Sequence, residues 1–245
     1  PAWYGGTRLW AGIMAIKIDQ VSLGFDGVQA VDDITLNLSE RRIGIIGANG
    51  SGKSTLARLM AGLIAPDQGG VWVNDVDVFK DRKGALNTIG IIFQNPDHQI
   101  IFPTCTEEIA FGLTQQGLAR SAADAQARAI LTAHHRADWA DKLAHQLSQG
   151  QRHYLCLMSI LAMRPQVIIL DEPYAGLDLP TSMHLHATLA GLDQQVVMIT
   201  HDPRVLVDYD RIIWMDQGRV MGDGVPDGIL SQYITTMEAR VDVGD

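Results

Sequence analysis

The stretch Gly47-Ala48-Asn49-Gly50-Ser51-Gly52-Lys53-Ser54-Thr55 decides the fold class of this chain. It fits the pattern G-x-x-x-x-G-K-[ST], whose glycines let backbone N–H groups turn toward a phosphate. The apolar run Ile43–Ile46 precedes the loop, and apolar residues at helical spacing over 56–63 follow it. A plain glycine-rich turn would explain the glycines but not Lys53 and Ser54. The pattern in this strand–loop–helix context therefore predicts a phosphate-binding loop.

Each polar group of this loop suits one part of a nucleotide. Lys53 would neutralise the β- and γ-phosphates, and the Ser54 hydroxyl would ligate Mg²⁺. The N-terminus of the following helix adds a partial positive charge at the same place. The residues predicted here to bind the nucleotide are Gly47, Asn49, Gly50, Ser51, Gly52, Lys53, Ser54 and Thr55.

Further polar sites follow apolar runs that are typical of buried strands. These sites are Gln94, after Ile89–Phe93; Asp171 and Glu172, after Val167–Leu170; and His201, after Val196–Ile199. Taken alone, each could be a surface acid or a structural histidine. Because the carboxyl ends of parallel strands share one edge of a sheet, we expect these groups to meet beside the phosphate loop. Their convergence favours a functional interpretation.

The adjacent carboxylates are expected to have different roles. Asp171 suits a Mg²⁺ ligand beside the phosphate loop, whereas Glu172 points elsewhere and can activate a water that attacks the γ-phosphate. His201 would support the γ-phosphate and the water. Gln94 would ligate Mg²⁺ or orient the water.

Alternating strands and helices predict an α/β fold with a helical lobe inserted at about 96–163. We expect residues 14–95 and 164–245 to form the nucleotide-binding core, and residues 1–13 to be an extension outside it. Asp216-Gln217-Gly218 is typical of a hairpin turn, and a last helix is predicted over 227–239. Ser121 with Asp124 resembles a capping box that would open an alanine-rich helix.

Composition and charge exclude several classes of protein. The 245 residues are 47% hydrophobic and 19% charged, which is typical of a globular chain with a sizeable core. The net charge of −9 argues against a duplex DNA binder. All of the excess acid lies in residues 165–245, which hold four basic and thirteen acidic groups. We expect most of these acids to form a solvated face turned away from an anionic membrane.

Neither a disulfide framework nor a membrane span is predicted. Cys105 and Cys156 are too few for a framework and are expected to be reduced thiols. The longest stretch without Asp, Glu, Lys or Arg is Leu179–Leu192, which contains Pro180 and is shorter than the ~20 apolar residues of a span.

The segment Leu147–Gln151 adds a motif that distinguishes one family. Ser148 and Gln151 have the spacing of a capping box at the start of an apolar helix, which is also a place where anions bind. Together with the phosphate loop, Gln94, Asp171-Glu172, Ala175–Asp178 and His201, this segment resembles, in order and over about 15–240, the ABC-type ATPases.

The resemblance implies a P-loop NTPase fold with a mainly parallel sheet, an N-terminal antiparallel β part and an inserted α-helical subdomain that carries the signature motif. It also implies that two ATPase subunits pair head to tail around ATP and Mg²⁺, most simply as a homodimer. The signature residues directed at the opposite subunit's nucleotide would be Ser148, Gln149, Gly150 and Gln151. Asp178 would link the two sites, and Phe25 would stack on adenine unless it is a core residue. Gln149 departs from the usual glycine, but activity is expected to survive.

A narrower resemblance lies in Phe93–Gln99 and in Pro103-Thr104 followed by Glu107–Gly112. These segments are similar to the ATPases of energy-coupling factor (ECF) transporters, which import vitamins and transition-metal ions. The short chain favours biotin over cobalt, nickel or another vitamin. Integral membrane subunits would dock on the helical subdomain at the cytoplasmic face of the membrane, and no nucleic acid partner is expected.

Three alternatives stay open from the sequence. The chain could be a soluble ABC-type ATPase of DNA repair, chromosome structure or translation, although such proteins usually carry a long coiled coil or a second cassette. It could be the ATPase of another ABC importer. It could also be an interaction protein with an inactive nucleotide site, which the intact Lys53, Glu172 and His201 disfavour.

Overall fold

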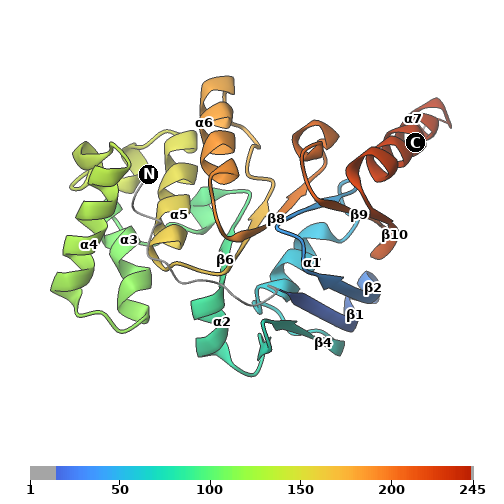
Figure 1. The fold of residues 1–245 in the computed structure, drawn as a ribbon, viewed down its shortest axis with the longest axis horizontal. Helices are drawn as coiled ribbons and strands as arrows, with labels where there is room; N and C mark the ends of the chain where they lie inside the picture. The colour runs from blue at the N-terminus through green and yellow to red at the C-terminus, as the bar shows by residue number, and fades with distance from the viewer. Residues whose placement is uncertain (1–14, 244–245) are drawn as a thin grey trace.

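Apolar runs form two β-sheets in residues 15–243, the part of the chain that the computed structural model describes (Figure 1). The strands are β1 (Ile16–Phe25), β2 (Val28–Leu38), β3 (Arg42–Ile46), β4 (Gln68–Val73), β5 (Val76–Asp77), β6 (Ile89–Ile92), β7 (Val167–Asp171), β8 (Gln195–Thr200), β9 (Arg211–Asp216) and β10 (Arg219–Gly224). The helices are α1 (Lys53–Met60), α2 (Arg82–Thr88), α3 (Cys105–Gln115), α4 (Arg120–Ala133), α5 (Gln149–Ala162), α6 (Leu179–Ala190) and α7 (Pro226–Val243).

The larger sheet has the strand order β10-β9-β3-β8-β7-β6, and the smaller has the order β2-β1-β4-β5. Neighbouring strands from β9 to β6 run parallel, whereas β10 and every strand of the smaller sheet pair antiparallel. The predicted fold class is confirmed. Every residue of β7 and β8 is buried, because both faces of the parallel sheet are covered.

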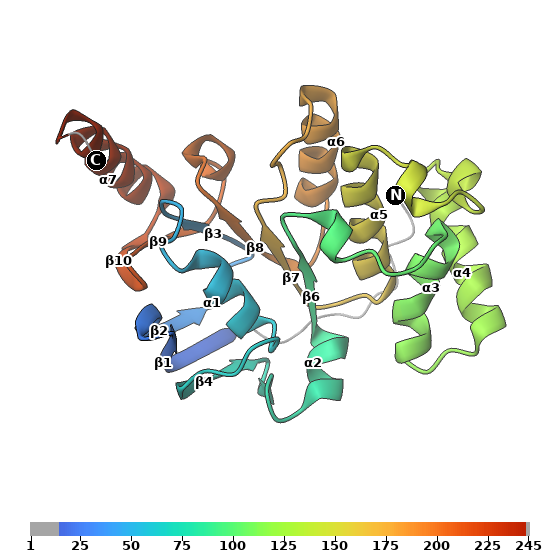
Figure 2. The same ribbon diagram turned by 180° about the vertical axis from the view of Figure 1, so that it is seen from behind.

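Helix α1 lies between the two sheets and fills the core that they share (Figure 2). Its apolar residues Leu56, Leu59 and Met60 are fully buried at helical spacing, as their pattern predicts. Because the phosphate loop enters α1 directly from β3, packing of this helix fixes the position of the loop.

Residues 96–163 contain the α-helices α3, α4 and α5, which lie side by side at one end of the molecule (Figures 1 and 2). They share a second hydrophobic core with one face of the larger sheet. The opposite end holds the β1–β2 hairpin and α7. In both views β6 lies between α5 and α1, and Figure 2 shows β7 there as well.

Several local predictions need correction. The predicted strands Ile16–Val21 and Ile34–Leu38 are longer, because Asp26-Gly27 makes a tight turn with positive φ at both residues and extends the pairing. Helix α4 begins after Ala119 without a side-chain cap, so the Ser121 box is wrong.

The end of the chain follows the predicted pattern more closely. The hairpin turn at Gln217-Gly218 is confirmed, and the last helix spans Pro226–Val243. The interpretation of residues 1–13 as an extension lies outside the described residues. No helix within 15–243 has both the length and the apolar character needed to cross a membrane.

Candidate active site

The phosphate loop is closed around the ammonium group of Lys53. Its Nζ donates hydrogen bonds to the carbonyl oxygens of Gly47 and Ala48, each at 2.8 Å, and the residue is 6% exposed. Burial lowers the pKa of Lys53, and the negative charges of Glu172 and Asp171 oppose that shift. A buried cation therefore lies inside the loop, beside two carboxylates.

Glycine is required in this loop by close backbone packing. Gly52 has a φ of 99°, and a Cβ atom there would come within 2.3 Å of the Ala30 carbonyl oxygen. A Cβ atom on Gly47 would come within 2.2 Å of the Met215 carbonyl oxygen. Gly52 also starts α1 without any side-chain cap. The first N–H groups of α1 therefore keep their capacity to bind an anion.

Asp171 lies at the carboxyl end of β7, opposite the start of α1. The Ser54 hydroxyl donates to its Oδ1 at 3.1 Å, so these two oxygens are already adjacent. Burial raises the pKa of Asp171, while the hydrogen bond from Ser54 lowers it and the nearby Glu172 raises it further. The pair offers a hydroxyl and a carboxylate oxygen to a hard cation.

Glu172 faces away from Asp171 toward the end of β8. Its Oε1 lies 2.8 Å from Nδ1 of His201, and its Oε2 accepts a hydrogen bond from Thr200 at 3.2 Å. The backbone of Glu172 has a φ of 50°, and its N–H donates to the Ile199 carbonyl oxygen. This left-handed conformation turns adjacent carboxylates to different partners, as their predicted roles require.

Gln94 follows β6 at the same edge of the parallel sheet. Its side chain is exposed, and its backbone carbonyl oxygen lies 3.0 Å from Nε2 of His153 on α5. The phosphate loop, Glu172 and His201 follow β3, β7 and β8, which are neighbours in the sheet with β6 at its edge. The predicted convergence of these strand ends is confirmed.

The signature segment lies on the other side of β6 and β7, at the start of α5. Ser148 accepts a hydrogen bond from the Gln151 N–H, and the Gln151 side chain accepts from the Ser148 N–H, so the predicted capping box is confirmed. Gln149 Nε2 donates to the Ala175 carbonyl oxygen at 3.5 Å. The exposed Ser148 side chain therefore stands at a helix N-terminus away from the phosphate loop of its own subunit.

Asp178 caps α6 by accepting a hydrogen bond from the Thr181 N–H at 2.9 Å. Hydrogen bonding by the Thr181 side chain, together with this backbone bond, lowers the pKa of Asp178. The starts of α5 and α6 are in close contact, since a Cβ atom on Gly150 would lie 2.6 Å from Thr181 Cγ2. The predicted signature and linking residues thus share one surface.

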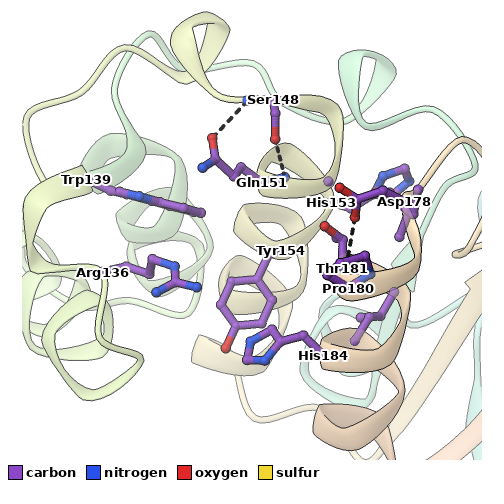
Figure 3. A pocket seen from close by; sticks show the side chains of 13 residues that line it. Arg136, Trp139, Ser148, Gln151, His153, Tyr154, Asp178, Pro180, Thr181 and His184 are labelled. Atoms are coloured by element: carbon purple, nitrogen blue, oxygen red, sulfur yellow. Dashed lines mark hydrogen bonds between the residues drawn. The ribbon is translucent and has the colours of Figure 1, made fainter.

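A cavity of about 390 Å³ opens between these helix starts (Figure 3). Ser148, Gln151 and Asp178 line one side of it, and Arg136 lies over the rings of Trp139 and Tyr154, 5.4 and 5.8 Å from their centroids. This aromatic group was not predicted from the sequence. Its residues come from two helices and a turn, and no spacing pattern connects them.

Phe25 is 53% exposed at the tip of the β1–β2 hairpin, so the alternative of a core residue is wrong. The sequence analysis also missed Thr200 as a partner of Glu172. Its position next to His201, at the end of a buried strand, was the available signal.

Comparison with known proteins identifies the family. A family model described as ABC transporter matches residues 31–175, more than half of the chain, and these residues include the phosphate loop, the signature segment and Glu172. The chain belongs to the ABC transporter family. This ABC protein is an ATPase whose hydrolysis of ATP is coupled to transport. Solved cassettes similar to it include a dimer and a part of an ABC transporter complex.

The similar proteins are transport ATPases. The biotin transport ATP-binding protein BioM of Rhodobacter capsulatus is 56% identical over 95% of this chain and 99% of its own length. The energy-coupling factor transporter ATP-binding protein EcfA1 of Caldanaerobacter subterraneus is 37% identical over 86% of this chain and 79% of its own. The structure of cbiO1 from Clostridium perfringens, part of the ABC transporter complex cbiONQ, superposes with a TM-score of 0.75 at 27% identity, covering 91% of this chain and 93% of that one.

Proposed function

We propose that this ABC protein is the ATP-hydrolysing subunit of an ECF-type importer that takes up biotin. The observation that supports biotin as the substrate is the 56% identity to a biotin transport ATP-binding protein along nearly the whole of both chains. The similarity to an ECF transporter ATPase supports the importer class. These relatives favour transport over the alternative of a soluble ATPase in DNA repair or translation.

The donor set beside the phosphate loop fits Mg²⁺ with a bound nucleotide. Ser54 Oγ and Asp171 Oδ1 are the oxygens that would hold the ion, with Gln94 as a further ligand at the edge of the sheet. Mg²⁺ usually takes one or two protein oxygens and completes its coordination with phosphate oxygens and water. When bound, the ion would neutralise negative charge on the β- and γ-phosphates.

Hydrolysis would depend on the residues that position the γ-phosphate and a water. The first N–H groups of α1 and the Lys53 ammonium would hold the phosphates, exchanging the bonds of Lys53 to loop carbonyls for phosphate oxygens. Glu172 would take a proton from the attacking water. The hydrogen bonds from Thr200 and His201 would hold that carboxylate in place.

The second half of each site would come from another copy of the chain. Ser148 and Gly150 stand at the exposed start of α5, across β6 and β7 from α1, so they would reach a nucleotide bound by a partner subunit. A head-to-tail homodimer would place them against the γ-phosphate. Phe25 would stack on adenine in its own subunit, and Asp178 would connect the two sites.

Integral membrane subunits would dock on the helical subdomain formed by residues 96–163 and hold the ATPase at the cytoplasmic face of the membrane. Gln94 begins the segment that leads from β6 into this lobe. It would therefore report nucleotide binding to the docked partner.

A replacement experiment tests the proposed function. A Rhodobacter capsulatus strain that lacks BioM would receive this chain, and uptake of radiolabelled biotin and of cobalt would be measured. We expect biotin uptake to be restored and cobalt uptake to be unchanged. Lys53→Ala is the matched control, because it should leave the fold intact but fail to hold the phosphates. Equal restoration by Lys53→Ala would contradict a role of ATP, and no restoration by the wild-type chain would contradict biotin transport.

A further inference from the structure

Hydrogen bonds from its own side chains stabilise the loop that contains Gln94. The Phe93 N–H donates to Oε1 of Gln99 at 3.2 Å, and Nε2 of Gln99 donates to the Ile91 carbonyl oxygen at 3.3 Å. Asn95 caps the short turn that follows by accepting from the Asp97 N–H. Residues 93–99 therefore form one ordered unit that can be held or displaced as a whole.

His153 holds this unit from the signature helix. It lies on α5 five residues after Ser148, is 2% exposed, and its Nε2 is 3.0 Å from the Gln94 carbonyl oxygen. Because a carbonyl oxygen can only accept, Nε2 must carry the hydrogen. Burial lowers the pKa of His153, which favours the neutral ring, while the hydrogen bond to Gln94 opposes that shift.

The neighbouring residue makes a second contact with the same loop. Arg152 Nε lies 2.8 Å from Oδ1 of Asp97, and its Nη1 donates to the Leu147 carbonyl oxygen at 2.6 Å. Arg152 thus joins the loop to the residue just before Ser148. Two adjacent side chains of α5 hold the loop at two points.

We infer that His153 is a positioning residue that fixes the Gln94 loop to the signature helix and so couples the two ATP sites of a dimer. This inference rests on the proposed function, in which Gln94 serves the nucleotide of its own subunit and Ser148 serves that of the partner. The hydrogen bond between His153 and Gln94 then joins the loop that serves one ATP site to the helix that serves the other. A shift of Gln94 toward a bound nucleotide moves the start of α5, and Ser148 moves with it.

The substitutions His153→Leu and His153→Gln separate this role from simple packing. Leucine fills similar space but cannot donate, whereas the glutamine amide can reach the position of Nε2 and donate to the same carbonyl. We expect the leucine variant to lose cooperativity, with a Hill coefficient for ATP near one, and its kcat to fall about five- to thirty-fold with a smaller change in KM. The glutamine variant should recover most of the cooperativity and most of the kcat.

Ser159→Ala supplies the matched control. Ser159 is a buried donor on the same helix, but its hydroxyl bonds to the Leu155 carbonyl oxygen within α5 and does not reach the loop. This variant should keep the wild-type Hill coefficient and kcat. Thermal melting of every variant shows whether the fold is retained.

Three outcomes would overturn the inference. They are a leucine variant that keeps wild-type cooperativity and kcat, a glutamine variant as impaired as the leucine variant, and a wild-type enzyme whose hydrolysis is not cooperative. If His153→Leu does not fold, Asp97→Asn takes its place, because the Asp97 side chain is 59% exposed. That substitution removes the ion pair between Arg152 and the loop, so it should also lower the Hill coefficient. Failure of the proposed function is distinguishable, because it would appear as absent ATP hydrolysis in the wild type.

Discussion

The carboxylates Asp171 and Glu172 are neighbours in the chain but meet different surroundings. Asp171 is buried against Ser54, while Glu172 is held by Thr200 and His201. The left-handed backbone at Glu172 makes this division possible. Each carboxylate can therefore be tested separately.

Glu172→Gln should leave ATP binding intact and lower turnover at least ~10²-fold, because the amide cannot accept the proton of the attacking water. The measurement is steady-state hydrolysis together with ATP affinity. Glu238→Gln, which removes an exposed carboxylate on α7, should hydrolyse ATP normally. Turnover of the Glu172 variant close to that of the wild type would remove Glu172 from the mechanism.

Asp171→Asn should stabilise the nucleotide-free protein at neutral pH while it weakens Mg²⁺-dependent ATP binding. Burial raises the pKa of Asp171 above its value in the unfolded chain, so the charged form costs folding free energy. That cost is absent below the unfolded pKa and grows as the pH rises through the folded pKa. We expect the melting temperature to rise by about 2–4 °C for each kcal/mol relieved.

A pH series of thermal melts checks the sign of this effect. The difference between Asp171→Asn and the wild type should shrink as the pH falls toward the usual range of an aspartate. A variant that is less stable than the wild type at neutral pH would show that the hydrogen bond from Ser54 outweighs burial.

At the scale of the element, the start of α5 combines a structural and a functional role. Ser148 caps the helix, and the same exposed N-terminus is the predicted contact with the partner's nucleotide. A substitution that removes the cap would confuse loss of stability with loss of function.

Aspartate and asparagine both cap helices about as well as serine, so they separate the two roles. Ser148→Asp should keep the melting temperature within a few degrees but abolish hydrolysis, because its charge repels the γ-phosphate. Ser148→Asn should melt equally well and retain measurable hydrolysis. Equal activity of both variants in a steady-state assay would argue against a phosphate next to Ser148.

In the whole molecule, strands of the larger sheet lie between α5 and α1 (Figure 2). In the proposed function, a complete site therefore needs two copies. Glu172→Gln should form a stable dimer of about twice 26.7 kDa when ATP and Mg²⁺ are added, since bound ATP would persist between the subunits. Light scattering measures this mass. Lys53→Ala should stay monomeric, and a dimer whose stability ignores ATP would contradict the sandwich arrangement.

The acidic last third of the chain runs from β7 through α6, β8, β9 and β10 to α7, and α7 lies at the end opposite α3 and α4 (Figure 2). The expectation of a plain solvated face is only partly right. Asp216 pairs with Arg240, Asp223 with Arg211, and Asp202 with Arg204. These three acids are thus paired with arginines of the same region, although the region as a whole keeps its excess of acid.

The phosphate loop, the buried strands and the capping box at Ser148 can all be predicted from the order of the amino acids. Each depends on a local rule: glycines where the backbone must approach a ligand, unbroken apolar runs where both faces are covered, and a serine three residues before a glutamine. Parallel pairing then implied that the strand ends would meet.

Contacts between side chains from distant parts of the chain could be seen only in the folded molecule. The hydrogen bond between His153 and the Gln94 carbonyl joins residues that lie 59 positions apart, and the exposure of Phe25 depends on a hairpin tip. The same holds for the cavity beside Ser148, whose aromatic residues come from separate segments. Such contacts depend on how whole elements pack, and no local pattern of residues encodes that packing.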